Sequence, residues 1–263
     1  MALESHLVLW LSSHGQEAMT RSFAFLLLLL APLRAADSIP PARTPVLVEL
    51  FTSEGCSSCP PADALLAKLD ELQPVSGVTV IPLEEHVDYW DHQGWRDPFS
   101  SADFTLRQQR YAGLLHIESP YTPEMVIDGR SEFVGNDSER ALHELAGAAG
   151  RPKTRIHLTV NGNATLTVHI DPASASATVW LAIAETRLAS DVARGENAGR
   201  NLKHSAVVRK LNPIGKLKPG EAFSAEPVVK LAKQWKPENL RAVVFVTDAT
   251  ARVLGAAEAA LRD

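Results

Sequence analysis

The sequence predicts an α/β domain, in which helices flank a mixed sheet, followed by a smaller and mostly β domain. Between residues 44 and 150, apolar runs typical of buried strands alternate with segments of helical periodicity. After Gly150-Arg151-Pro152 the helical periodicity mostly ends and apolar–polar alternation takes its place. We therefore expect one domain over residues 44–150 and a second over residues 153–263.

The first domain is expected to begin with a buried strand at 46–52, where the residues are almost all apolar. Leucines at helical spacing then predict a helix at about 60–72, and the two prolines at its start fit a first helical turn. The other elements expected in this domain are a strand at 78–83, a helix at about 102–115, strands at 124–128 and 131–134, and a helix at 138–148.

The second domain is expected to begin with a β-hairpin. Residues 155–160 alternate, Asn161-Gly162-Asn163 is a strong turn signal, and residues 164–170 alternate back. Further strands are expected at 178–184 and 242–247, while 254–261 fits a strand or a short helix and 228–235 fits a helix or a strand with a turn.

The only two cysteines of the chain, Cys56 and Cys59, lie where the first strand meets the first helix. A helix N-terminus offers free N–H groups and a partial positive charge, which favour a thiolate at the first cysteine. The two-residue spacer lets the second thiol close a disulfide. We interpret the pair as catalytic: Cys56, the more exposed and more acidic thiol, attacks, and Cys59 resolves the mixed disulfide.

Other interpretations of the pair stay open. A structural disulfide would stabilise little, because so short a loop removes little entropy from the unfolded chain. A zinc site would need His or carboxylate ligands as well, since no other cysteine remains. The main alternative functions are a copper(I) binding or delivery protein that uses Cys56, Cys59 and His86, and a non-catalytic module in which the second domain binds a partner.

The order strand, Cys-x-x-Cys, helix, strand, helix, strand, strand, helix is the layout of the thioredoxin fold. That fold requires a proline that opens the third core strand and lies against the cysteine pair. Thr122-Pro123 stands at this position, and we predict that its peptide bond is cis, with Ser119-Pro120 as the weaker alternative. The backbone of Thr122 would then bind the extended chain of a substrate.

A polar and aromatic segment follows the second strand, at residues 86–99. In the functional interpretation, His86 or Asp88 transfers protons, and Tyr89, Trp90 and Trp95 line a substrate groove near the cysteines. Two alternatives remain: a metal group drawn from His86, Asp88, Asp91 and His92, or a packed insertion that covers the sheet. A second polar segment, 195–200, is expected either to reach toward the cysteine pair or to be only a long connection.

The first 36 residues resemble an export signal. From Met19, where we suspect that translation begins, a short basic start leads into an eleven-residue apolar core at 23–33 and then small residues. The core is shorter than the ~20 residues that span a bilayer, so a cleaved signal is favoured over a signal-anchor. We therefore expect a periplasmic or secreted protein with no stable membrane span after signal removal.

The composition limits the partners. The formal net charge is −5 and there is no basic run, so nucleic acid is not an expected partner. No phosphate-cradling glycine loop and no flavin or nicotinamide fingerprint is present, so no cofactor is expected. The expected partners are a protein or small molecule that bears a disulfide or thiol, and an external redox partner, because a two-thiol site must be reoxidised or rereduced after each cycle.

Four segments in order, 49–63, 86–95, 122–126 and 195–200, resemble the signature of a bacterial secreted family catalogued as domain of unknown function 1223. The resemblance covers nearly the whole mature chain. It implies a thioredoxin-like domain in an exported bacterial protein, and it leaves the activity open.

Overall fold

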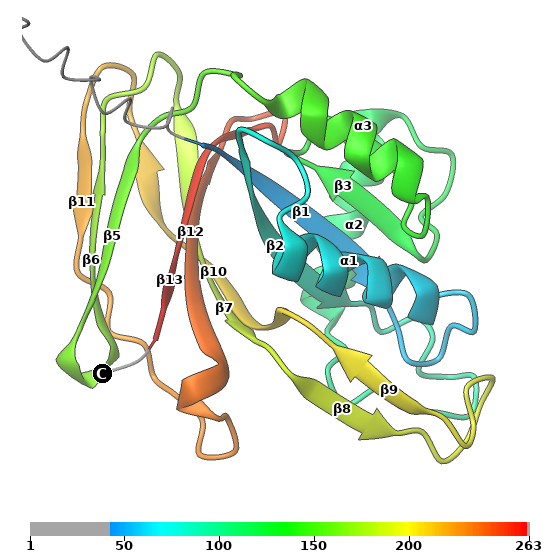
Figure 1. The fold of residues 1–263 in the computed structure, drawn as a ribbon. Helices are drawn as coiled ribbons and strands as arrows, with labels where there is room; N and C mark the ends of the chain where they lie inside the picture. The colour runs from blue at the N-terminus through cyan, green and yellow to red at the C-terminus, as the bar shows by residue number, and fades with distance from the viewer. Residues whose placement is uncertain (1–42, 262–263) are drawn as a thin grey trace, which may run out of the picture. The chain divides into compact units, whose positions relative to one another are not determined.

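The structure, a computed structural model, describes residues 43–261, and one eight-stranded mixed sheet runs through them (Figure 1). The strand order is β13-β12-β7-β10-β2-β1-β3-β4. The strands before residue 150 are β1 (Thr44–Thr52), β2 (Val78–His86), β3 (Glu124–Ile127) and β4 (Ser131–Val134). Those after it are β7 (Ala177–Glu185), β10 (Val207–Leu217), β12 (Leu240–Thr247) and β13 (Val253–Ala260). The expected signal at 1–36 and the expected start at Met19 lie outside the described residues.

The two segments expected as separate domains meet inside this sheet. β10 lies parallel to β2, with Val207 opposite Glu84, and the backbone N–H of Glu84 donates to the carbonyl of Ala206 at 2.9 Å. Without β10, β2 would be an edge strand with unpaired backbone groups. Residues 44–150 and 153–263 therefore share one sheet, and the change of pattern at residue 150 marks a change of architecture within it.

Helices cover both faces of the part of the sheet built from β1 to β4. The helices α1 (Pro60–Leu72) and α3 (Ser138–Ala148) pack Leu66 and Leu145 onto one face, against Val48 of β1. The helix α2 (Ala102–Leu115) lies on the opposite face (Figure 1), and its Tyr111 packs there against Phe51 of β1. All three helices begin and end at the predicted residues.

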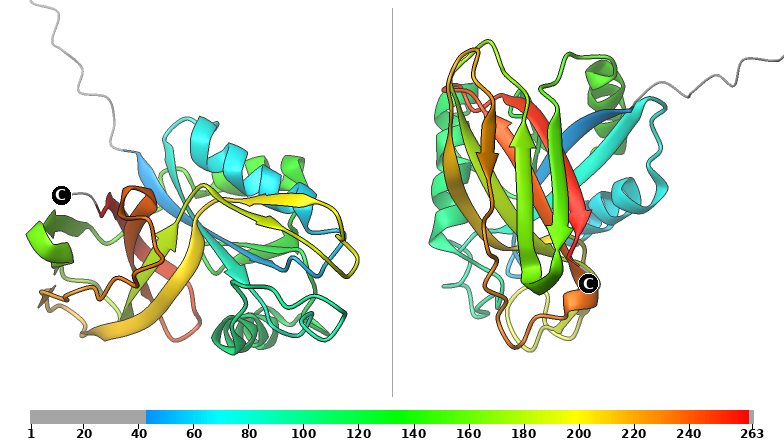
Figure 2. Two further views of the ribbon diagram at one scale, coloured as in Figure 1. Left: turned by 90° about the horizontal axis from the view of Figure 1, so that it is seen from below. Right: turned by 90° about the vertical axis from the view of Figure 1, so that its left-hand side faces the viewer.

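The remaining part of the sheet is covered by a second, three-stranded sheet. Its strands are β5 (Ile156–Asn161), β6 (Thr165–Ile170) and β11 (Phe223–Ala225), in the order β11-β6-β5. Alternate residues of β6 point into a core shared with β7 and β12, and Figure 2 shows the two layers face to face. The predicted hairpin joins β5 to β6 through a 3-10 turn, Gly162–Ala164.

A separate hairpin, β8 (Leu188–Asp191) and β9 (Asn201–His204), extends alongside α1 (Figure 1). The sequence did not predict β8, β9, β10 or β11. Residues 254–261 form a strand for most of their length, and residues 228–235 form neither a helix nor a strand. A second 3-10 turn spans Pro237–Asn239. No helix within residues 43–261 is long and apolar enough to cross a membrane.

Candidate functional site

Cys56 and Cys59 form a disulfide in the turn between β1 and α1. Pro60 and Pro61 begin the helix, so that Cys59 is the residue that caps it. Because the two prolines have no N–H, the first N–H groups of the helix are those of Ala62 and Asp63, and both donate to the carbonyl of Cys59, at 2.8 and 3.1 Å. Cys56 therefore precedes the helix by a full turn, which weakens the stabilisation of its thiolate by the helix terminus.

Both cysteines are buried in this disulfide form: Cys56 is 1% exposed and Cys59 is 0% exposed. The two serines between them are exposed. The expectation that the fold leaves the first sulfur at the surface is wrong for this form, because two loops from other parts of the chain pack against the turn. A reaction at Cys56 consequently requires one of these loops to move.

The first covering loop, residues 195–200, joins β8 to β9 and reaches the cysteine pair, as one of the two interpretations predicts. The buried Asn197 donates through Nδ2 to the carbonyl oxygens of Glu54 and Cys56, at 2.9 and 3.0 Å. The backbone N–H of Ser57 donates to Glu196 Oε2 at 3.0 Å. Gly195 has φ +77°, and a Cβ there would lie 3.2 Å from Trp95 Cβ, so glycine lets the two loops pack closely.

The second covering loop is the aromatic segment 86–99. A Cβ on Gly55 would lie 3.0 Å from Trp90 Cβ, so Trp90 lies directly against the residue before Cys56. The Trp90 indole N–H donates to Thr122 Oγ1 at 2.8 Å, and the Thr122–Pro123 peptide bond is cis, as predicted. Trp90 and Thr122 are half-buried, and Tyr89 is exposed and donates to Gln108 Oε1 at 3.2 Å. The structure thus brings Trp90, Thr122 and Pro123 together.

Glu54 connects the cysteine turn to the protein interior. Its backbone N–H donates to Asp97 Oδ2 at 2.8 Å. Its carboxylate accepts from the indole N–H of Trp95 at 2.7 Å and lies 3.2 Å from His204 Nε2. Because Glu54 is 1% exposed and both of its oxygens have partners, it is a fixed link rather than a mobile acid beside the thiols.

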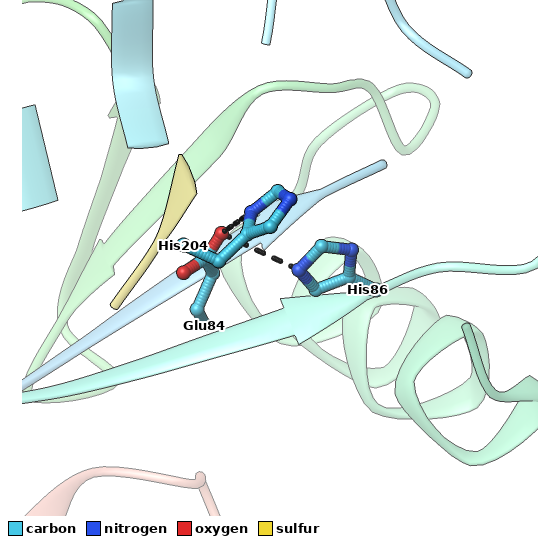
Figure 3. Close-up of side chains that lie close together, drawn as sticks. All are labelled: Glu84, His86 and His204. Atoms are coloured by element: carbon cyan, nitrogen blue, oxygen red, sulfur yellow. Dashed lines mark hydrogen bonds and ion pairs between the residues drawn. The ribbon is translucent and has the colours of Figure 1, made fainter. Parts of the chain in front are cut away.

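Glu54 and Asp97 contact a buried cluster formed by Glu84, His86 and His204 (Figure 3): Glu54 contacts His204, and Asp97 contacts His86. Glu84 Oε1 lies 2.7 Å from His204 Nδ1 and 3.3 Å from His86 Nε2. His86 Nδ1 lies 2.7 Å from Asp97 Oδ2. Within residues 43–261, these three side chains form the one group of three or more potential metal ligands whose ligand atoms lie within 4.8 Å of one another.

Burial and nearby carboxylates act in opposite directions on the two histidines. Burial lowers the pKa of His86, but Asp97 and Glu84 outweigh it and raise that pKa well above the ordinary value. Burial likewise lowers the pKa of His204, and the charge of Glu84 with the bonds to Glu54 and Glu84 raises it to about 9. In both rings the nearby carboxylates thus favour the imidazolium form.

The structure links His86 to the cysteine turn indirectly. No hydrogen bond or ion pair within the described residues joins His86 to Cys56 or Cys59; the connection runs through Asp97, which binds both His86 and the N–H of Glu54. Asp88 accepts a 2.6 Å hydrogen bond from Thr105 of α2, and Asp91 accepts from Ser100 at 2.9 Å. These two acids hold the aromatic loop in place.

Asp63 is a group that the sequence analysis did not single out. It lies in the first turn of α1, is 3% exposed, and accepts a 2.7 Å hydrogen bond from the hydroxyl of Thr52. Burial, with the charge of Glu84, raises the pKa of Asp63 to about 7. The one available signal was an acid four residues after Cys59, on the helix face that packs against the sheet.

The profile of the family described as "Protein of unknown function (DUF1223)" matches residues 47–247. The chain belongs to this family. The match confirms the resemblance carried by the four sequence segments, and those segments are the ones that meet around the disulfide. No curated protein matches the chain.

Two solved structures share the mixed α/β fold of this DUF1223 protein. A protein of Agrobacterium tumefaciens is 25% identical, with a TM-score of 0.67, over 84% of this chain and 96% of its own. HBP35 of Porphyromonas gingivalis is 14% identical, with a TM-score of 0.60, over 84% of this chain and 76% of its own.

Proposed function

We propose that this protein is an exported thiol–disulfide oxidoreductase in which Cys56 and Cys59 exchange electrons with protein or small-molecule substrates. The observation that carries the proposal is the disulfide itself, formed by the only two cysteines at a turn held by residues from two distant segments, 86–99 and 195–200. A ring this small contributes little as a staple. A redox role explains better than a structural one why distant residues hold the cysteine turn in place.

The arrangement around the pair supports a thioredoxin-like organisation of residues 44–150. β1, the cysteine turn, α1, β2, α2, β3, β4 and α3 follow one another in the order that this organisation needs. Thr122-Pro123 opens β3, and Thr122 binds Trp90, which lies against Gly55. We infer that an extended substrate chain lies along Thr122 and Trp90, with its sulfur directed at Cys56.

In the oxidising direction, a substrate thiolate attacks Cys56 Sγ and the Cys56–Cys59 bond breaks, so that Cys59 leaves as a thiolate and takes up a proton. A second substrate thiolate attacks the substrate sulfur of the mixed disulfide and releases Cys56 as a thiolate. The substrate loses two electrons and the protein gains them. An external dithiol–disulfide partner then reoxidises the pair; the reducing direction is the reverse of these steps.

We infer that Asp63 exchanges the proton of Cys59. Asp63 lies in the helical turn that follows Cys59, whose carbonyl accepts from the Asp63 backbone N–H at 3.1 Å. Burial, with the charge of Glu84, raises the pKa of the Asp63 carboxyl group to about 7, a value suited to proton transfer near neutral pH. His86, the group favoured by the sequence, acts in this scheme through Asp97 and Glu54 as a positioning residue.

Single cysteine variants test the assignment as a matched pair. With a disulfide-bonded peptide as substrate, the Cys56 thiolate of Cys59→Ser should attack the peptide disulfide, release one peptide thiol and accumulate as a mixed disulfide. Cys56→Ser should accumulate none, with mass spectrometry as the readout. If both variants trap the peptide equally, or if neither does, Cys56 is not the attacking group. A Cys56→Ser/Cys59→Ser protein that keeps full biological function would favour the non-catalytic partner-binding alternative.

A further inference from the structure

Three side-chain atoms from two distant segments converge in the interior between β2 and β9 (Figure 3). Glu84 Oε1, His86 Nε2 and His204 Nδ1 all lie within 4.8 Å of one another. Glu84 and His86 are 0% exposed and His204 is 4% exposed. His86 Nε2 has no well-aligned hydrogen-bond partner among the described residues, although it is directed at Glu84.

The opposite atom of each of these residues is held in place. His86 Nδ1 lies 2.7 Å from Asp97 Oδ2, and His204 Nε2 lies 3.2 Å from Glu54 Oε1. Glu84 Oε2 accepts from the backbone N–H of Ser205 at 2.8 Å. In metal sites, a ligating histidine commonly donates its other N–H to a carboxylate, which fixes the tautomer and the ring orientation. Here both histidines have such a carboxylate.

We propose that Glu84, His86 and His204 bind one divalent transition-metal ion. With Asp97 holding the Nδ1 proton of His86 and Glu54 holding the Nε2 proton of His204, the two remaining nitrogen lone pairs face Glu84 Oε1. The site lies apart from Cys56 and Cys59, and it stands whether or not the disulfide is catalytic.

Charge balance supports an ion at this point. Glu54, Glu84 and Asp97 supply three buried negative charges, which two imidazolium rings or one divalent cation can offset equally. Two imidazolium rings would have to lie with their centroids 4.9 Å apart, and His86 Nε2 would lack a well-aligned acceptor. A divalent ion removes both protons and engages all three atoms.

The donor set defines the class of ion. Two imidazole nitrogens and one carboxylate oxygen suit Zn²⁺, Fe²⁺ or Co²⁺, whereas copper(I) prefers thiolate sulfur. Three protein ligands leave a fourth position, which zinc commonly fills with water. Phe99 lies edge-on to both rings, with centroids 5.3 and 5.5 Å away, and helps to bury them. The bound ion would fix β9 to β2 and so hold the 195–200 loop on the cysteine turn.

The test uses the mature chain, unfolded in denaturant with a chelator and refolded in either Zn²⁺ or Co²⁺, because the buried site exchanges ions poorly in the folded protein. After gel filtration we expect one ion per chain by elemental analysis. The Co²⁺ form should show the visible absorption of a nitrogen–oxygen site, without a thiolate charge-transfer band. The melting temperature should be higher with the ion than without it.

Matched variants locate the ion. His204→Gln and Glu84→Gln should weaken retention at least ~100-fold, and Asp97→Asn, which removes only the outer carboxylate, by ~10–100-fold. Cys56→Ser/Cys59→Ser and His157→Gln, a change at an exposed histidine of β5, should each keep one ion per chain. Retention of the ion by a protein that fails the peptide-trapping test would refute the proposed function and leave the metal site in place.

The proposal is overturned if the refolded wild-type protein holds no ion and its melting temperature does not change with Zn²⁺ or Co²⁺. It is also overturned if the ion is lost with the cysteines but kept in His204→Gln. If a ligand variant fails to fold, the wild-type titration and the double cysteine variant still decide the question.

Discussion

Two buried clusters of charged side chains lie on opposite faces of the sheet at β2. Each cluster contains one of two neighbouring acids of this strand. Glu84 points to the α1 face, where it meets His86 and His204. Glu85 points to the α2 face, where Arg107 approaches Glu49 at 2.6 Å and Glu85 at 3.5 Å. Tyr111 also donates to Glu49, at 2.6 Å. Alternation along one strand therefore places two identical side chains in two different environments.

The clusters differ in how their charges are satisfied. On the α1 face each carboxylate has hydrogen-bond partners, and several of these belong to His204 and Ser205, far along the chain. On the α2 face neither oxygen of Glu85 has a hydrogen-bond partner in the described residues. Burial raises the pKa of Glu85 well above its ordinary value; the charge of Arg107 opposes this and that of Glu49 adds to it.

The difference indicates two roles. The α1-face cluster is linked through Glu54 and Asp97 to the turn that carries the disulfide. The α2-face cluster instead holds the sheet together: Arg107 lies 5.4 Å from the ring of Trp180 in β7 and 5.3 Å from that of Phe245 in β12. We expect changes in the first cluster to alter chemistry at the cysteines, and changes in the second to alter stability.

The largest expected effect on stability comes from Arg107→Ala. The change removes the guanidinium that pairs with the buried Glu49 at 2.6 Å, which should lower the free energy of unfolding by about 3–5 kcal/mol. Denaturant unfolding measures the change. Arg110→Ala, three residues along the same helix and exposed, should change it by less than about 0.5 kcal/mol. Equal losses in the two variants would remove the special role of the α2-face cluster.

Asp63→Asn should affect chemistry more than folding. An amide cannot exchange the proton, so thiol–disulfide exchange near pH 7 should slow by ~10²-fold, the range typical of proton-transfer groups. The comparison variant is Asp103→Asn, an exposed acid in the first turn of α2. Stopped-flow fluorescence of the exchange reaction gives the rates. An unchanged rate in Asp63→Asn would assign proton transfer to another group.

Asn197→Ala tests the loop that covers the cysteine turn. The change leaves the carbonyls of Glu54 and Cys56 without their buried donor, which should destabilise the protein by about 1–3 kcal/mol. It should also speed reduction of the disulfide by dithiothreitol, because the loop opens more often. Asn201→Ala, an exposed asparagine of β9, should leave that rate unchanged. A slower reduction in Asn197→Ala would contradict a covering role.

The smallest expected effect concerns Glu124, a third acid on the α2 face, which accepts from Gln108 at 2.7 Å. Burial, with the charges of Glu132 and Glu49, raises the pKa of Glu124 from 4.5 to about 7. The hydrogen bond from Gln108 lowers this pKa but is outweighed. Between these two values the folded protein binds more protons than the unfolded chain, so stability falls as pH rises through this window.

Glu124→Gln should therefore reduce the loss of stability between pH 5 and pH 8 by about 2 kcal/mol. Unfolding curves at the two pH values, compared with the exposed change Glu71→Gln, measure this effect. If the wild type and Glu124→Gln lose stability in parallel, Glu124 does not titrate in this window.

Local sequence patterns predicted the elements before residue 150 to within a few residues. The strands there are continuous apolar runs, and the first helix has leucines at helical spacing and two prolines at its start. β10 was not predicted, because Pro213 and two register shifts interrupt its alternation. Its pairing with β2 joins residues more than a hundred positions apart, and that pairing makes one sheet of two expected domains.

The candidate site was predicted in part for the same reason. The cysteine pair and Thr122-Pro123 have local signatures. Glu84 and His204 meet across 120 positions, and neither residue lay in a predicted strand, so no local pattern indicated their contact. His86 or Asp88 was expected at direct or water-bridged distance from Cys56, because the second strand ends at the same edge of the sheet as the cysteine turn. The structure instead shows Asp97 between His86 and the turn.

The central claim is that the Cys56–Cys59 disulfide exchanges electrons. Equilibration of the protein with glutathione redox buffers, followed by alkylation and mass spectrometry, gives its reduction potential. The account predicts a value between about −120 and −270 mV, the range of catalytic dithiol pairs. A potential below about −300 mV, typical of structural disulfides, would contradict it.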